Sequence, residues 1–268
     1  MTASALLATD LDRTLIYSAS AAGAVDGDAV TVECLDGRPL SFMTATAAGR
    51  FAALARAHVV VPVTTRTPAQ FARVRLPGPP ARYAVAANGG VLLVDGEPDV
   101  DWARAVRSAL RSAAPLEAAV ATLGAVCDGP WASPIRVAAD LFCYVVVDRP
   151  AMPDDVAHRL RTWAGPAGWC VSLQGRKLYL VPGPLTKSAA VAEVARRART
   201  ERLLAAGDSL LDIDLLAAAD RGVHPGHGEI AESGWSAPTV DALSSTGLLA
   251  GEEITAWFAT FVASEPVS

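Results

Sequence analysis

Two aspartates, Asp10 and Asp12, follow a short apolar run near the start of the chain, Leu6-Leu7-Ala8. A buried strand has no packing use for two acids at positions i and i+2, because both side chains would point to the same side. Such a pair usually binds a divalent cation, or does nucleophilic or acid/base chemistry. A solvated loop that carries two acids by chance is the alternative for this segment taken by itself.

Three further polar clusters stand just beyond predicted strands or open a predicted helix. They are Thr64-Thr65-Arg66, Thr186-Lys187-Ser188 and Gly207-Asp208-Ser209-Leu210-Leu211-Asp212. Ligands of an open parallel sheet bind in the crevice beyond the carboxyl ends of its strands. We therefore expect the four clusters to converge on one site, although they are far apart in the sequence.

Each cluster also has a structural interpretation. Thr64 could be an N-cap of the next helix, Asp208 a Gly-Asp cap, and Lys187 a solvated helix cation. Arg66 could contact a substrate or form a surface salt bridge. Lys187 is set apart by composition, because Lys177 is the only other lysine and arginine fills the remaining basic positions.

The elements that must position these clusters alternate between strand and helix over the first 95 residues. Apolar and β-branched runs predict strands at 5–9, 58–63 and 83–87, with helices at 46–57 and from Pro68 to about Val74. Asp36-Gly37 between two short runs predicts a hairpin flap over about 28–43. This order is typical of a doubly wound, mainly parallel, Rossmann-like α/β sheet.

The pattern then changes to helix-strand-strand, repeated twice, which predicts an inserted α+β domain over 96–181. It contains helices at 100–123, with a break at Pro115, and at 153–164. Its strands are expected at 135–139, 142–147, 169–173 and 177–181. The core, 1–95 and 182–268, resumes with a helix at 185–200, a strand at 202–206 and a helix at 210–218, then a looped region from Arg221 and a terminal helix at 252–262.

Composition bounds the class of protein. The chain has 268 residues, of which 51% are hydrophobic, and a formal net charge of −5. This favours a well-packed globule over a nucleic-acid-binding or disordered chain. No window approaches about 18 apolar residues and no leader pattern is evident, so we expect no membrane association and a cytoplasmic location. The four cysteines are scattered, which argues against a zinc site or disulfide framework; oligomeric state is not encoded in any pattern we recognise.

The ordered set of DLDRT, the threonine after VPV, Lys187 and GDSLLD resembles the motifs of the haloacid-dehalogenase-like (HAD) phosphohydrolase superfamily. Asn88-Gly89-Gly90 is similar to the Asn-Gly turn of the branch with an α/β cap between the second and third motifs. That branch includes Cof-like, sucrose-phosphate, trehalose-phosphate and mannosyl-3-phosphoglycerate phosphatases. The resemblance implies a hydrolase of phosphoric monoesters that uses Mg²⁺ and a small phosphorylated metabolite.

Phosphoryl chemistry suggests a role for each motif. Asp10 would be the nucleophile that forms an aspartyl-phosphate, and Asp12 would protonate the leaving alkoxide and then deprotonate water. Thr64, with Thr65 as its rival, and Lys187 would bind phosphate oxygens.

The metal would be held by Asp10 and Asp208, with Asp212 as a direct or indirect ligand. The resemblance adds the main-chain carbonyl of Asp12 to this set. Arg66, Asn88, Gly89 and, from the insert, Arg176 are further candidates for substrate or phosphate binding; the 224–229 His/Gly loop either borders the site or is structural.

The expected function is a magnesium-dependent phosphomonoesterase whose substrate is a sugar phosphate or a phosphoglycerate-type ester. A phosphomutase is one alternative, but such enzymes mostly carry a helical cap after the first motif. A receiver-type signalling domain is disfavoured by length and by the insert. A catalytically idle phosphate-binding protein of the same fold is the remaining alternative.

Overall fold

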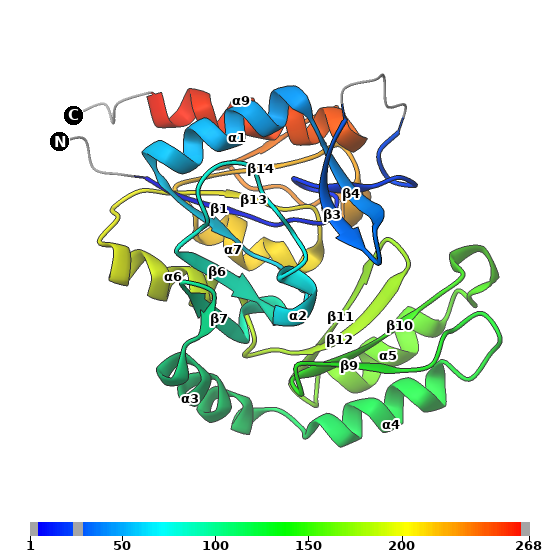
Figure 1. The fold of residues 1–268 in the computed structure, drawn as a ribbon. Helices are drawn as coiled ribbons and strands as arrows, with labels where there is room; N and C mark the ends of the chain where they lie inside the picture. Colours follow the sequence, from blue (N-terminus) through cyan, green and yellow to red (C-terminus); the bar gives the residue numbers. More distant parts are fainter. Residues whose placement is uncertain (1–4, 24–28, 264–268) are drawn as a thin grey trace. The chain divides into compact units, whose positions relative to one another are not determined.

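A computed structural model describes residues 5–23 and 29–263 (Figure 1). The chain forms two compact units, one within Met1–Pro98 and Lys187–Ser268, the other Asp99–Thr186. The first unit is therefore formed by two segments of the chain, one before the second unit and one after it. The expected division into 1–95 with 182–268 and an inserted 96–181 stays a prediction about the domain boundaries.

The first unit is built on a parallel sheet with the strand order β15-β14-β13-β1-β5. The strands are β1 (Leu6–Thr9), β5 (Val59–Pro62), β13 (Leu203–Ala206), β14 (Arg221–His224) and β15 (Val240–Ala242). Every residue of β1 is buried. Parallel strands covered on both faces are expected to be continuously apolar rather than alternating, which is why the runs before Asp10 and Asp208 were recognisable.

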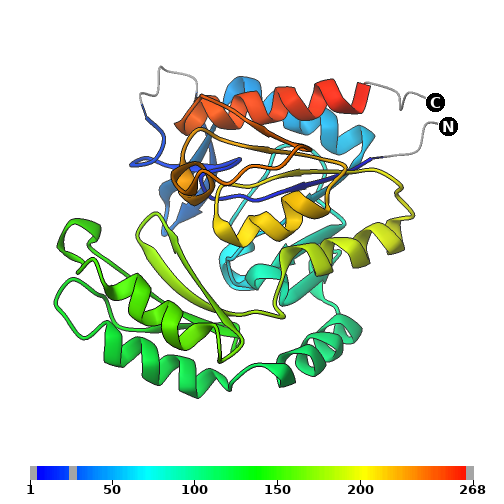
Figure 2. The ribbon, with the colours of Figure 1, turned by 180° about the vertical axis from the view of Figure 1, so that it is seen from behind.

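Helices cover both faces of this sheet. Figures 1 and 2 show α1 (Ala45–Ala57) and α9 (Gly247–Ala263) on one face, and α6 (Lys187–Ala198) and α7 (Ile213–Ala218) on the other. Phe51 of α1 and Phe258 of α9 belong to the same buried cluster as Leu7 of β1. The doubly wound α/β class predicted from the sequence is thus confirmed.

The predicted flap is a hairpin of β3 (Ala29–Leu35) and β4 (Arg38–Thr44), with β2 (Tyr17–Ser18) on the other edge of β4. Asp36 and Gly37 at its turn both have positive φ angles, 49° and 74°, which is the backbone form that an Asp-Gly hairpin turn requires. Residue 28, where the predicted flap begins, lies outside the described residues.

The third expected strand is present as β6 (Tyr83–Ala86), but it belongs to a separate antiparallel sheet. It contacts the parallel sheet through a bridge between Val63 and Val85, and then pairs antiparallel with β7 (Val91–Val94), which continues to β8 (Glu97–Pro98). The turn at Asn88 permits this reversal. The short helix α2 (Pro68–Phe71) begins with a capping box of Thr67 and Gln70 and ends earlier than expected.

The second unit is an antiparallel sheet with helices, as predicted. Its strand order is β11-β12-β10-β9, from β9 (Arg136–Ala138), β10 (Phe142–Val146), β11 (Trp169–Gln174) and β12 (Lys177–Pro182). The helices are α3 (Val100–Ala109), α4 (Leu116–Val126) and α5 (Val156–Ala164). Pro115 is the N-cap of α4, which confirms the predicted helix break.

The region after Arg221 is more regular than a loop. It forms β14, the helix α8 (Gly228–Ser233) and β15, and α9 begins at Gly247 rather than near Glu252. The Gly, His and Pro content of this segment concealed two short strands that are recruited by the neighbouring sheet edge. None of the helices in the described ranges is long and apolar enough to cross a membrane.

Candidate active site

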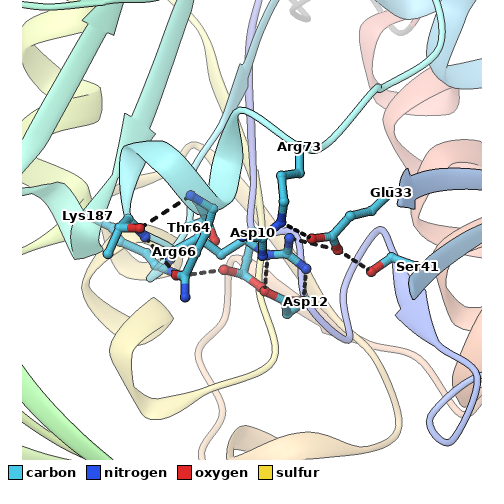
Figure 3. A network of polar contacts seen from close by, with 10 residues as sticks. Asp10, Asp12, Glu33, Ser41, Thr64, Arg66, Arg73 and Lys187 are labelled. Atoms are coloured by element: carbon cyan, nitrogen blue, oxygen red, sulfur yellow. Dashed lines mark hydrogen bonds and ion pairs between the residues drawn. The ribbon is translucent and has the colours of Figure 1, made fainter. Parts of the chain in front are cut away.

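Three chain segments end side by side at the carboxyl edge of the parallel sheet. The amide of Asp10, just after β1, donates to the carbonyl of Ala206 on β13 (2.9 Å), and that of Val63, after β5, donates to Thr9 (2.8 Å). Asp10, Thr64 and Asp208 therefore leave adjacent strands at the same edge, as expected for a doubly wound sheet. Figure 3 shows Asp10 and Thr64 close to Lys187.

Lys187, the first residue of α6, lies between two carboxylates. Its Nζ is 2.6 Å from Oδ1 of Asp10 and 2.5 Å from Oδ1 of Asp212, and its side chain is fully buried. Burial by itself would lower the pKa of Lys187, but the charges of Asp10 and Asp212 outweigh that effect and raise it. The lysine is a fixed positive charge beside Asp10.

The carboxylates of Asp10, Asp208 and Asp212 form a buried cluster in which one oxygen of each lies within 4.8 Å of the others. Burial raises the pKa of Asp10 to about 7, although Lys187 opposes the shift. Burial also raises the pKa of Asp208, with further contributions from the charges of Asp10 and Asp212. The three acids face the ammonium of Lys187 and, beside Asp208, the guanidinium of Arg13 at 3.4 Å, and carboxylate oxygens are the donors that Mg²⁺ prefers. The donor set therefore fits a divalent cation.

Asp212 differs from the other two acids because both of its oxygens have protein partners. Oδ1 accepts from Lys187, while Oδ2 accepts from the amides of Asp208 and Ser209 and from the Ser209 hydroxyl at 2.7 Å. Within the described ranges, no donor reaches Oδ2 of Asp10 or Oδ1 of Asp208. Asp10 and Asp208 thus each have a carboxylate oxygen available for a cation. Asp212 instead stabilises the turn at 208–209 and positions Lys187.

Thr64, Thr65 and Asn88 lie together beside this cluster. Thr64 donates its amide to Val85, and its own carbonyl accepts from the amide of Asn88 at 2.9 Å. All three side chains are buried. Asn88 has a left-handed backbone with φ of 55°, and Gly89 has φ of 94°, so the turn predicted from Asn-Gly places both residues next to Thr64.

Arg66 and Asp12 form a two-pronged ion pair. Nε of Arg66 lies 2.7 Å from Oδ2 of Asp12, and Nη2 lies 2.7 Å from Oδ1. On its other side, Nη1 is 2.9 Å from Glu33 of the flap. The arginine is buried while the Asp12 side chain is 39% exposed, so the ion pair that the sequence offered as one interpretation is present, with only its arginine inside the protein. Glu33 had no sequence signal beyond being an acid in a hairpin strand.

The remaining candidates are Arg176 and the 224–229 loop. Arg176 is in the turn between β11 and β12 of the second unit, where its carbonyl accepts from Val147; its role in substrate binding stays a prediction. The 224–229 loop supports the site: Nε2 of His227 donates to the carbonyl of Arg13 at 2.8 Å, and the amide of Ile230 donates to the carbonyl of Asp208.

Gly228 in this loop has φ of 90°, and a Cβ there would lie 2.5 Å from the Asp208 carbonyl oxygen. The loop thus packs against the backbone that carries Asp208, which favours the structural interpretation of its glycines.

Comparison with known proteins identifies the fold. No protein-family model and no curated protein sequence matches the chain. Among solved structures, it is similar to the sucrose-phosphatase of Synechocystis sp. PCC6803, determined with sucrose and phosphate, with a TM-score of 0.64, 18% identity, and 97% and 99% of the two chains covered.

Two further matches have related descriptions. The C-terminal domain of trehalose-6-phosphate phosphatase from C. albicans matches with a TM-score of 0.57, 12% identity, and 96% and 92% of the chains covered. A phosphatase of the HAD enzyme superfamily from Bacteroides thetaiotaomicron matches with a TM-score of 0.55, 14% identity, and 97% and 96% covered. These matches extend over nearly the whole chain, so that both the sheet and the inserted unit of this protein have the fold of the HAD superfamily phosphatases.

Proposed function

We propose that this protein is a magnesium-dependent phosphomonoesterase that acts through an aspartyl-phosphate. The observation that carries the proposal is the buried carboxylate of Asp10, which lies between the ammonium of Lys187 and a second buried acid, Asp208, at the carboxyl edge of the sheet. The likeness of the fold to phosphatases that act on sugar phosphates supports it.

The nucleophilic step uses Asp10. One of its oxygens forms a bond to phosphorus while the bond from phosphorus to the ester oxygen breaks, and the alkoxide that leaves takes a proton from Asp12. Lys187 offsets the negative charge of the carboxylate and phosphoryl group as they approach. We expect the hydroxyl of Thr64 and the turn at Asn88-Gly89 to bind phosphoryl oxygens.

The second step regenerates the carboxylate. Water gives its proton to Asp12 as its oxygen attacks the phosphorus of the acyl phosphate, and the bond to Asp10 breaks to release inorganic phosphate. Mg²⁺ would be held by the carboxylates of Asp10 and Asp208 and the carbonyl of Asp12, where it supplies electrostatic stabilisation of the phosphoryl oxygens. Asp212 acts on this site by holding Lys187.

The substrate is a small phosphorylated metabolite, and a sugar phosphate is the class we favour. Two of the similar structures are phosphatases of sucrose phosphate and trehalose 6-phosphate. The second unit, Asp99–Thr186, would then be the cap that selects the substrate, with Arg176 as one contact.

The test is phosphate release from a panel of sugar phosphates and other monoesters, with and without Mg²⁺. We expect hydrolysis only with the cation, without isomerised sugar phosphate. Isomerisation would indicate the phosphomutase alternative, and binding of phosphate without any turnover would indicate the idle binding protein.

A further inference from the structure

Arg13 directly follows Asp12 and has no part in the proposed reaction. Its backbone is left-handed, with φ of 66°, a conformation that has a steric cost for arginine and none for glycine. The backbone is held on both sides of the residue, because the amide of Arg13 donates to the carbonyl of Ile16 at 2.9 Å and its carbonyl accepts from Nε2 of His227 at 2.8 Å. A glycine would suit this turn better, so the reason for an arginine lies in its side chain.

The guanidinium of Arg13 lies beside Asp208. Its Nε is 3.4 Å from Oδ2 of the aspartate, whose side chain is 5% exposed against 32% for the arginine. The backbone of Gly228 covers the same oxygen from another direction, since a Cβ added there would lie 2.6 Å from Oδ2. No donor in the described part of the chain reaches Oδ1. A cation can therefore bind Asp208 through Oδ1 while Arg13 stays at Oδ2.

Arg13 changes the charge balance of the acid cluster. With all three carboxylates ionised, as cation binding requires, Asp10, Asp208 and Asp212 face two positive groups, Lys187 and Arg13, which leaves a net charge of −1. A divalent cation would convert this to +1. Without Arg13 the same two states would have net charges of −2 and 0.

The two ligands expected at this site respond to such a charge in opposite ways. A positive group repels Mg²⁺ and attracts a phosphoryl dianion, and salt screens these interactions less at a partly buried site than at the surface. A merely structural role for Arg13 predicts something else: removal of the residue would then weaken the binding of both ligands.

We propose that the guanidinium of Arg13 sets the relative affinity of the site for its two ligands. It weakens the binding of the divalent cation at Asp208 and strengthens the binding of the phosphoryl anion. The inference rests on the proposed function, because it takes the site to bind both ligands. It gives a reason for an arginine at a left-handed position that suits glycine.

The experiment measures binding rather than turnover. Isothermal titration calorimetry gives the Kd of Mg²⁺ for the chelator-treated protein, and then the Kd of inorganic phosphate, the reaction product, at saturating Mg²⁺. The variants are Arg13→Gln, which removes the charge, and Arg13→Lys, which keeps it. Arg50→Gln is the matched control: it changes the net charge of the protein by the same amount, but Arg50 on α1 pairs with Glu252 on α9, at 3.7 Å.

We expect Arg13→Gln to bind Mg²⁺ roughly tenfold more tightly than the wild type, and inorganic phosphate roughly tenfold more weakly, because one unit charge at a partly buried site changes binding by about this much. Arg13→Lys and Arg50→Gln should stay within about threefold of the wild type for both ligands. Arg13→Gly also removes the charge and suits the left-handed backbone, so it carries the test if Arg13→Gln does not fold.

The inference alone would be overturned if the uncharged variants bound Mg²⁺ no more tightly than the wild type, or bound phosphate no more weakly. It would also be overturned if Arg13→Lys behaved like Arg13→Gln, or if Arg50→Gln showed the same changes. A wild-type protein that does not bind Mg²⁺ would overturn the magnesium-dependent function proposed above, and the inference with it.

Discussion

Gly207 and Asp212 are packed so closely that a Cβ on Gly207 would lie 2.4 Å from the Cβ and Cγ atoms of Asp212. Gly207, at the end of the strand that leads to Asp208, therefore packs directly against Asp212, the acid that contacts Lys187. Gly207 is not among the residues with positive φ, so its backbone conformation does not require a glycine. The close approach of Asp212 does.

Gly207→Ala should displace Asp212 and weaken its contact with Lys187. Overpacking of this kind costs about 1–3 kcal/mol of stability, and we expect phosphate release to fall at least tenfold. Urea unfolding and an activity assay measure the two effects. Gly49→Ala on the exposed side of α1, where a Cβ would meet nothing within 4 Å, is the control and should stabilise the protein. Equal behaviour of the two variants would contradict the packing argument.

Asp10→Asn should abolish turnover and leave the fold intact. An amide cannot replace the carboxylate as nucleophile, whereas burial already disfavours the ionised form of Asp10, as its raised pKa indicates. The measurements are phosphate release and thermal unfolding, with Asp36→Asn in the hairpin turn as the control. Retained hydrolysis in Asp10→Asn would refute the assignment of the nucleophile.

Lys187→Met should be both inactive and destabilised. Removing the ammonium leaves Asp10 and Asp212 buried without their cation, and breaking a buried pair in this way costs roughly 3–5 kcal/mol. Urea unfolding measures the loss of unfolding free energy in Lys187→Met. The control is Arg56→Met, on the exposed surface of α1. A variant as stable as the wild type at neutral pH would mean that the two acids do not depend on the lysine.

The metal-free protein should lose stability as the pH rises from about 4 to about 7. The pKa of Asp10 is 3.8 ordinarily and about 7 in the folded protein. The folded state therefore binds more protons than the unfolded state in this window, so the contribution of Asp10 is fully present below pH 3.8 and is lost as the pH passes 7. The difference in unfolding free energy between wild type and Asp10→Asn, measured against pH with a chelator, isolates this effect.

Added Mg²⁺ should make the difference in unfolding free energy between wild type and Asp10→Asn less dependent on pH, because a cation favours the ionised carboxylate. If this difference in unfolding free energy does not change with pH in the absence of metal, or increases with pH, the pKa of Asp10 is not raised by burial.

The positions of Asp10, Thr64 and Asp208 could be predicted from the sequence because each follows an apolar run, and parallel strands end at a common edge. The partners of these residues could not. Arg66 meets Glu33 because a register shift in β3 buries that acid, and such a shift has no local signal in a short strand. β14 and β15 differ from the prediction for a related reason: the short runs Arg-Gly-Val-His and Val-Asp-Ala become strands only when a sheet edge is available to pair with them.

The strand that precedes Asp10, the proposed nucleophile, has a partner on each side in the parallel sheet. β1 pairs with β5 on one side and with β13 on the other, where Leu6 lies opposite Leu203, about three quarters of the way along the 268-residue chain. During synthesis on the ribosome, one edge of β1 has no partner until the insert and then β13 have been made. An unpaired strand edge is a template for wrong pairing, so we expect the risk of misfolding and aggregation to be highest before β13 has been synthesised.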